Sequence, residues 1–367
     1  MYSEADIEAA VASGAMTPEA AASLRAMTAE RAETPLADQE HFRLLTGFND
    51  IFVAIALLLF FISLGWLLRT GTLVSGLVSA AVSWGLAEFF TRRRHMALPS
   101  ILLLNTFVQG VFAASFAALG ALAGVALGAR GGFFVTLFAP STNGSNTSTI
   151  ALIFAGAAAA TAMAAYLHWR RFMVPITVAA GTVAVGAMIV ALLLGFVPGL
   201  REYWLVLVFI AGIAAFAFAM WWDMSDTRRT TRRSDVAFWL HLVAAPLIIH
   251  PVFSTLGLLD SDEANSGRAI AAIVLYLALT VVALAIDRRA VLVSALLYVL
   301  YAIVTLLRAD GEMGGSLALT GLIVGSALLL LSAFWQAGRR SVVKLLPADL
   351  ARRLPAIDRE ASLRPAS

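Results

Sequence analysis

Long apolar stretches separated by short polar gaps fill the chain from residue 51 to residue 335. Most of them are close to the ~20 residues that a helix needs to cross ~30 Å of hydrocarbon. The third stretch would be ~46 Å long as one helix, so we expect it to tilt, protrude or break near its glycines. The pattern predicts ten membrane spans: 51–68, 73–90, 97–127, 149–168, 173–196, 203–222, 236–258, 269–286, 290–307 and 315–335.

Arginine is distributed unevenly among the gaps between these stretches. Every second gap carries a cluster, and the gaps between them carry single arginines. Because cytoplasmic loops retain Lys and Arg, the clustered side and both termini are predicted to be cytoplasmic. The clusters are Arg92–Arg94, Arg170–Arg171, Arg228–Arg229 with Arg232–Arg233, Arg288–Arg289 and Arg339–Arg340, and the single arginines are Arg69, Arg130, Arg201, Arg268 and Arg308.

The segments that flank the apolar region have helical patterns of their own. Gly14 is placed to end a first short helix, and Thr17-Pro18 is placed to start a second, which predicts a helical hairpin. The C-terminal tail alternates apolar and basic residues, so it should lie along the cytoplasmic leaflet. The expected fold class is all-α, a polytopic transmembrane helix bundle. Its predicted parts are a cytoplasmic hairpin at 1–33, a linker at 34–50, the bundle at 51–336 and the basic amphipathic tail at 337–367.

The predicted cytoplasmic turns resemble one another. Around Arg92–Arg94, Arg170–Arg171 and Arg288–Arg289, an outgoing span, an arginine pair and the next span follow in the same order. This pattern suggests stacked helical hairpins joined by short basic turns. Any paired spans that follow the charge rule would also look like this, so both interpretations stay open.

Composition supports a membrane protein and narrows the chemistry. The 367 residues are 60% apolar and 13% charged, with a mean hydropathy of +0.86, far outside soluble usage. The net charge of +3 follows from the placement of the arginines, and no basic face with interleaved aromatics indicates nucleic-acid binding. The chain has no cysteine, which excludes disulfides and thiolate chemistry. Since no hydrolase, protease or phosphate-loop motif occurs, we expect no catalytic residue, metal or cofactor, and no enzyme.

Glycines at four-residue spacing predict where helices pack closely. Such small residues share one helix face and let two backbones approach where lipid supplies no hydrophobic drive. We expect Gly124 to lie against a neighbouring helix, either within the chain or at the seam of a homodimer. The predicted packing glycines are Gly120, Gly124 and Gly128 in the third span and Gly321 and Gly325 in the tenth.

Few polar residues lie inside the predicted spans, and such residues are costly in lipid. Glu88, Asn105, Gln109 and His241 are all predicted to lie in the half of the membrane nearer the cytoplasm. We therefore predict one intramembrane polar cluster, in which His241 contacts one or more of the other three. Simpler roles stay open, namely an interfacial position for Glu88 and interhelical hydrogen bonds for Asn105 and Gln109.

The seventh span is the least ordinary of the ten. His241 and His250 are nine residues apart, about 900° on a regular helix, so they should face opposite sides and not clamp a metal or haem. Pro246 and Pro251 free backbone carbonyls at depth. A cavity, if the bundle has one, is expected to touch this span.

Several segments together carry a resemblance to known proteins. They are the hairpin SEADIEAAVASGAMTPEAAASLRAM, the link ending HFRLLTGFND, the segment SDVAFWLHLVAAPLIIHPVF and the tail RRSVVKLLPADLARRLP. The combination resembles a group of uncharacterised proteobacterial polytopic membrane proteins with a short N-terminal hairpin and paired spans. The resemblance covers nearly the whole chain. It implies a bacterial inner-membrane location and carries over no activity and no functional residue.

Two classes of function stay open. A carrier, or a protein that handles lipids or apolar solutes, is favoured by the span count, the hairpin repetition and the proline-interrupted seventh span. A membrane scaffold or sensor that presents the N-terminal hairpin to a cytoplasmic protein partner is favoured by the small number of intramembrane charges. The expected partners are membrane lipids, that cytoplasmic protein and a second copy of the chain, and not nucleic acid.

Overall fold

The chain divides into two compact units, Met1–Leu44 and Leu45–Ser367. The computed structural model describes residues 7, 10–24, 48–68, 71–124, 147–226, 231–257, 266–289 and 332–347, with single positions between 291 and 330. The boundary between the units falls inside the linker predicted at 34–50.

The first unit contains two short helical segments joined by a turn. Residues 10–12 are helical, and Gly14 follows with a φ of 75°, the left-handed conformation that ends many helices. Residues 18–24 are helical, and the Thr17 hydroxyl accepts a hydrogen bond of 3.2 Å from the Ala20 amide. The helix stop and start predicted at Gly14 and Thr17 are therefore confirmed.

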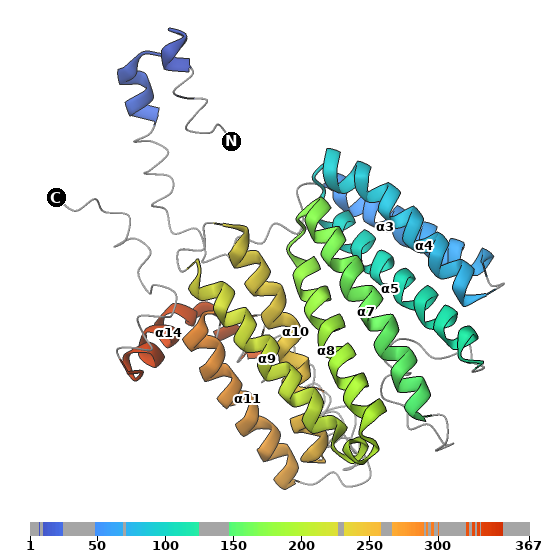
Figure 1. Cartoon of the computed structure of the whole chain (residues 1–367). Helices are drawn as coiled ribbons and strands as arrows, with labels where there is room; N and C mark the ends of the chain where they lie inside the picture. The colour runs from blue at the N-terminus through green and yellow to red at the C-terminus, as the bar shows by residue number, and fades with distance from the viewer. Residues whose placement is uncertain are drawn as a thin grey trace. The chain divides into compact units, whose positions relative to one another are not determined.

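The second unit is built from helices, and the part of the chain that is described contains no strand (Figure 1). Two short elements are irregular: a π-helix, η1, continues α4, and a 3₁₀ helix, η2, leads into α9. In chain order the elements are α3 (Phe48–Leu67), α4 (Thr72–Ala87), η1 (Glu88–Arg93), α5 (Ala97–Leu122), α7 (Thr147–Phe172), α8 (Ile176–Phe196), η2 (Pro198–Tyr203), α9 (Trp204–Met224), α10 (Arg232–Thr255), α11 (Ser266–Ile286) and α14 (Trp335–Lys344).

Among the described residues, seven helices are long and apolar enough to cross a membrane, as expected of a multi-pass membrane protein. They coincide with the first seven predicted spans to within a few residues at each end. α11 coincides with the eighth predicted span, 269–286. The ninth and tenth predicted spans, 290–307 and 315–335, lie almost entirely outside the described residues.

The third predicted span ends earlier than 127. α5 stops at Leu122, and Gly124 follows with a φ of 65° and donates from its amide to the Ala121 carbonyl (3.2 Å). Glycine adopts this left-handed conformation without steric cost, which lets the chain leave the helix. The expected break near a glycine is confirmed at Gly124.

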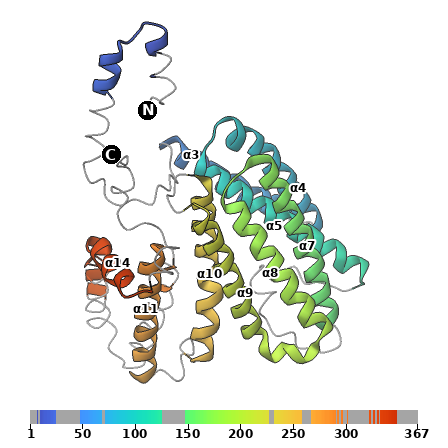
Figure 2. The same cartoon turned by 60° about the vertical axis from the view of Figure 1, so that its left-hand side comes forward.

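Consecutive helices pack as hairpins. The closest pairs are α4 with α5, α7 with α8 and α9 with α10, and α5 also packs against α7 (Figures 1 and 2). α8 packs closely against α7 but contacts α9 at fewer positions. The junction between α8 and α9 is therefore looser than the contacts within the three hairpins.

Three turns that follow helices share a backbone conformation. His95 after η1, Met173 after α7 and Asp287 after α11 have φ values of 54°, 54° and 56°. Residues with a Cβ atom rarely adopt this left-handed region. Each of the three lies beside an arginine pair, so the shared conformation supports the predicted repeat of hairpins joined by basic turns.

Two close helix contacts involve glycines that the four-residue spacing did not single out. A Cβ atom on Gly76 of α4 would lie 2.7 Å from the Gly110 carbonyl oxygen of α5, and one on Gly110 would lie 2.7 Å from the Gly76 carbonyl oxygen. A Cβ on Gly212 of α9 would lie 2.8 Å from the carbonyl carbon of Leu247 in α10. The absence of a side chain thus brings backbones together in two of the hairpins.

The prediction that Gly124 packs against a neighbouring helix is wrong for the described helices of the chain, and its homodimer alternative stays a prediction. A Cβ on Gly124 would meet no described atom within 4 Å, and the same holds for Gly321 and Gly325. Gly120 is buried in α5, and Gly128 lies outside the described residues. Four-residue spacing shows that glycines share a helix face, but it does not show whether another helix covers that face.

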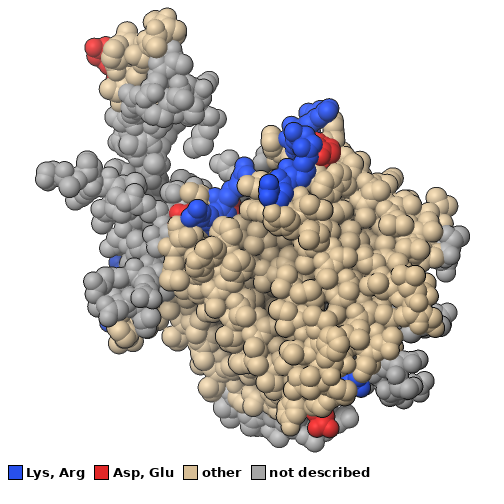
Figure 3. Space-filling model, in the orientation of Figure 1, with Lys and Arg blue, Asp and Glu red and all other residues tan. Residues whose placement is uncertain are grey.

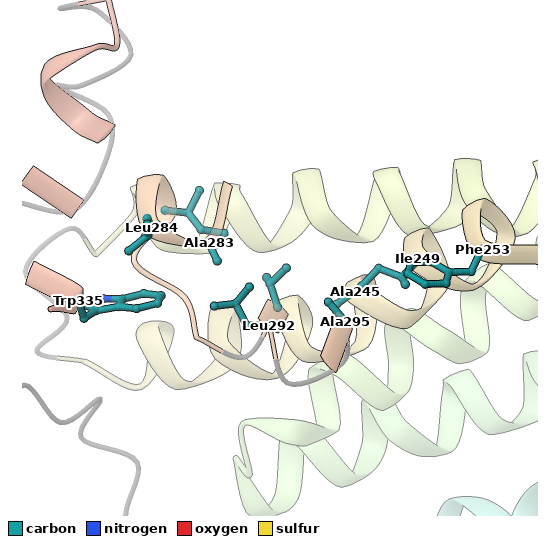
Figure 4. Packing of buried hydrophobic residues seen from close by; sticks show 10 residues of the cluster. Ala245, Ile249, Phe253, Ala283, Leu284, Leu292, Ala295 and Trp335 are labelled. Carbon is teal, nitrogen blue, oxygen red and sulfur yellow. The ribbon is translucent and has the colours of Figure 1, made fainter. Parts of the chain in front are cut away.

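A large apolar cluster joins α10, α11 and α14. Ile249 and Phe253 of α10 belong to it together with Ala283 and Leu284 of α11 and Trp335 at the start of α14 (Figure 4). α10 is the most enclosed of the seven spans, with half of its apolar window buried. The seventh predicted span is therefore an interior helix of this part of the bundle.

Basic side chains gather at one end of the helices. Figure 3 shows them above a broad surface without charged groups. The clusters Arg92–Arg94, Arg170–Arg171 and Arg232–Arg233 lie at the adjoining ends of η1, α7 and α10, whereas Arg201 lies in η2 at the opposite end. We call the first end the basic end. The described arginines follow the alternation seen in the sequence.

Candidate functional site

A buried ion pair connects three segments near the basic end. Asp223 is in the last turn of α9, and Arg288 follows α11; they are 2% and 1% exposed. Arg288 Nε donates to Asp223 Oδ2 at 3.1 Å, and Arg288 Nη2 donates to Asp223 Oδ1, so the contact is bidentate. Arg288 Nη2 also lies 3.2 Å from the Ser234 carbonyl oxygen of α10. The guanidinium thus ties α9, α10 and the turn after α11 together.

His241 of α10 lies beside this pair and is fully buried. Its Nδ1 is 2.8 Å from the Ala237 carbonyl oxygen and 3.7 Å from Asp223 Oδ2, and the Phe216 ring packs edge-on with a centroid distance of 5.3 Å. A carbonyl oxygen can only accept, so Nδ1 carries a proton in this arrangement. The histidine therefore donates toward an oxygen-rich corner formed by α9 and α10.

The predicted cluster of Glu88, Asn105, Gln109 and His241 does not form. Glu88 accepts from Arg171 Nε at 2.6 Å and from Arg92 Nη1 at 3.2 Å. Asn105 and Gln109 are exposed on α5, and Gln109 Nε2 donates to Asn105 Oδ1 at 3.1 Å. The prediction rested on depth in the membrane, and depth does not determine the direction in which a side chain leaves its helix.

A second buried polar group fixes the start of α14. Trp335 Nε1 donates to Asp287 Oδ1 at 2.9 Å, and Arg339 Nε lies 3.8 Å from the same oxygen. The Arg289 guanidinium lies over the Trp335 ring, 4.9 Å from its centroid. Arg288 and Arg289 therefore serve two different contacts, one with α9 and one with α14.

An apolar groove with a volume of about 720 Å³ runs between α7, α8 and α9. It forms where α8 stands away from α9, and small residues on both helices, including Gly181, Gly186, Ala211 and Ala214, deepen it. It extends along α8 from Thr177 in the first turn to Leu193 in the last. The expected contact between a cavity and α10 is not seen for this groove, because α7, α8 and α9 supply all of its lining.

The polar atoms of the groove wall lie toward the basic end. The Tyr166 hydroxyl accepts from Arg170 Nη1 at 2.9 Å. The Thr177 hydroxyl is 3.2 Å from Nδ1 of His168, a buried histidine packed edge-on against Trp84. Trp222 also lines the groove, and its buried Nε1 has no hydrogen-bond partner among the described residues.

The described residues contain no group of three or more His, Cys, Asp or Glu side chains that could hold a metal ion. The chemistry that the groove offers is therefore hydrocarbon contact along its length and hydrogen-bond donation at one end. A search of the chain against family models, curated proteins and solved structures finds no match.

Sequence reasoning missed Asp223, Arg288, His168 and Trp222. A usable signal existed for the ion pair, because Asp223 follows one predicted span and Arg288 follows another on the same predicted side of the membrane. An acid and an arginine at matching depth are candidates to pair. We found no comparable signal for the groove, since its lining residues look like any other apolar span residues.

Proposed function

We propose that the protein binds, and carries or presents, a lipid or another apolar solute in the groove between α7, α8 and α9. The groove is the observation that supports this function. It is lined almost wholly by aliphatic and aromatic side chains over the length of α8, so its natural occupant is a hydrocarbon. No catalytic step is part of the proposal.

We further propose that the chain is a ten-span protein of the bacterial inner membrane with the basic end in the cytoplasm. The support is the gathering of arginines at one end of the described helices, together with the apolar stretches at 290–307 and 315–335. The groove would then open toward the lipid and reach the cytoplasmic leaflet at its polar end.

Gly186→Leu tests the function by filling the groove. The nearest atom to a Cβ at Gly186 is the Ala211 Cβ at 3.9 Å, so the new side chain has room to enter the groove without a backbone clash. Gly85→Leu is the matched control, because Gly85 is exposed on α4 and a Cβ there meets nothing within 4 Å.

The measurement is the number of phospholipids that the detergent-purified protein retains, read by native mass spectrometry. We expect Gly186→Leu to lose a lipid that the wild type and Gly85→Leu both keep. Equal retention by all three proteins would contradict the function.

A scaffold function has one observation in its favour, since Met1–Leu44 forms a compact unit separate from the helices. Deletion of residues 1–33 separates the two functions. Lipid retention unchanged by the deletion supports the groove function, and a cytoplasmic partner lost with the deletion supports the scaffold.

A further inference from the structure

The two ends of the groove between α7, α8 and α9 differ in chemistry. The Tyr166 and Thr177 hydroxyls and the Trp222 indole lie toward the basic end. The other hydroxyl in the lining, that of Thr182, is already used, because it donates to the Val178 carbonyl oxygen at 2.9 Å. From there to Leu193 the wall is hydrocarbon. A groove that is polar at one end and apolar along the rest matches an amphiphile rather than a plain hydrocarbon.

The polar end offers the donors of an arginine. The Trp222 Nε1 is enclosed by protein atoms and is not open to the groove. Arg170 donates one N–H to Tyr166, and its guanidinium lies 5.9 Å from the centroid of that ring. Arginine carries five N–H donors and a permanent charge, so Arg170 keeps donors for a ligand at the mouth of the groove. This end is built for an anion that accepts hydrogen bonds.

The length of the groove suits an extended chain. Thr177 and Leu193 are sixteen residues apart on α8, so the groove is about 24 Å long. The groove also extends past the middle of a hydrocarbon layer of ~30 Å, as one long acyl chain would.

We propose that the ligand of the groove is an anionic phospholipid, with its head group at the basic end against Arg170. One acyl chain lies along α8 toward Leu193. The proposal rests on the function proposed above and names the chemical class of the ligand. It also sets the leaflet from which the lipid enters, which is the leaflet at the basic end.

The test is a competition between phosphatidylglycerol and phosphatidylcholine with identical acyl chains, supplied in equal amounts in mixed micelles. Native mass spectrometry counts each lipid retained. We expect the wild type to favour phosphatidylglycerol about fivefold, the factor that one arginine contributes near anionic head groups. Arg170→Gln should bring the ratio close to one.

One matched control separates the site from a general loss of basic charge. Arg93→Gln removes an exposed arginine of η1 and should keep the ratio of the wild type.

The outcomes distinguish the head-group assignment from the function on which it rests. If Arg170→Gln keeps the wild-type ratio while Gly186→Leu still loses the lipid, the assignment is overturned and the function stands. Retention of added palmitate in place of phosphatidylglycerol would also overturn the assignment. A dimer that Gly186→Leu dissociates, with no lipid lost, would show that a helix of a second copy occupies the groove and would overturn both.

Discussion

Asp223 and Arg288 have lost nearly all contact with solvent. Each charged group is stabilised by hydrogen bonds to the other in place of hydrogen bonds to water. Taking a carboxylate or a guanidinium out of water is costly, and the cost is offset only while a bidentate partner and further hydrogen bonds remain. The Ser234 carbonyl and hydroxyl supply such contacts to Arg288 Nη2, at 3.2 and 3.3 Å. At the residue scale, the stability of this buried pair therefore depends on the presence of both partners and of their hydrogen bonds.

Replacement of Asp223 by asparagine should therefore destabilise the protein strongly. The variant leaves Arg288 charged and buried without its bidentate partner, a change that costs about 3–5 kcal/mol in other proteins. Thermal unfolding in detergent should show a clearly lower midpoint. Glu88→Gln is the control, because Glu88 and Arg171 are well exposed and their pairing is screened by solvent.

The double variant Asp223→Leu with Arg288→Leu checks the cause. Removal of both charges should recover much of the stability that Asp223→Asn loses, since no unpaired charge is left buried. A double variant as unstable as Asp223→Asn would show that the geometry of this corner, and not its charge balance, holds the helices together.

At the scale of the elements, the hairpin of α4 and α5 depends on two glycines that face each other. Gly110→Ala should destabilise it by about 1–3 kcal/mol, because the new Cβ would lie 2.7 Å from the Gly76 carbonyl oxygen and neither backbone can yield locally. The measurement is the same thermal unfolding in detergent.

Gly85→Ala is the matched control on α4. A Cβ there has open space, and alanine is a better helix former than glycine by up to about 1 kcal/mol. This control should unfold at the same temperature as the wild type or slightly higher. If Gly110→Ala behaved like Gly85→Ala, the close approach of α4 and α5 would be wrong.

The helices themselves could be predicted from the sequence, whereas their partners could not. Length and apolar content locate a span, and both are properties of a single stretch of chain. The choice of neighbour depends on which face of each helix is covered, and the spans are apolar on nearly every face. Spacing alone therefore favours Gly124, which no described helix covers. It gives no preference to the equally spaced pairs that do pack together, Gly76 with Ala80 and Gly110 with Ala114.

At the scale of the whole molecule, the arrangement of arginines predicts orientation. Alkaline phosphatase fusions should be inactive, and fluorescent protein fusions bright, after Arg94, Arg171 and Arg233. Fusions within η2, between α8 and α9, should behave in the opposite way. An active phosphatase after Arg171 would reverse the proposed orientation and with it the leaflet from which the lipid enters.

The candidate site could be predicted only in part from the sequence. His241 was recognised because a histidine within an apolar span is unusual, and it is indeed buried beside a charge. It bonds to the Ala237 carbonyl of its own helix, and the charge beside it is Asp223 of α9, a segment that the prediction did not consider. The groove arises from the separation of two whole helices, a quantity that no short motif encodes.

The backbone contact between α9 and α10 bears on how the protein enters the membrane during synthesis. Pro251 has no N–H, so the Leu247 carbonyl lacks its usual helical donor, and the bare backbone of Gly212 lies against this same residue. If α10 entered the lipid without α9, the Leu247 carbonyl would be exposed to hydrocarbon. We therefore expect α9 to stay at the translocon until α10 has been synthesised, so that the two helices enter the bilayer together.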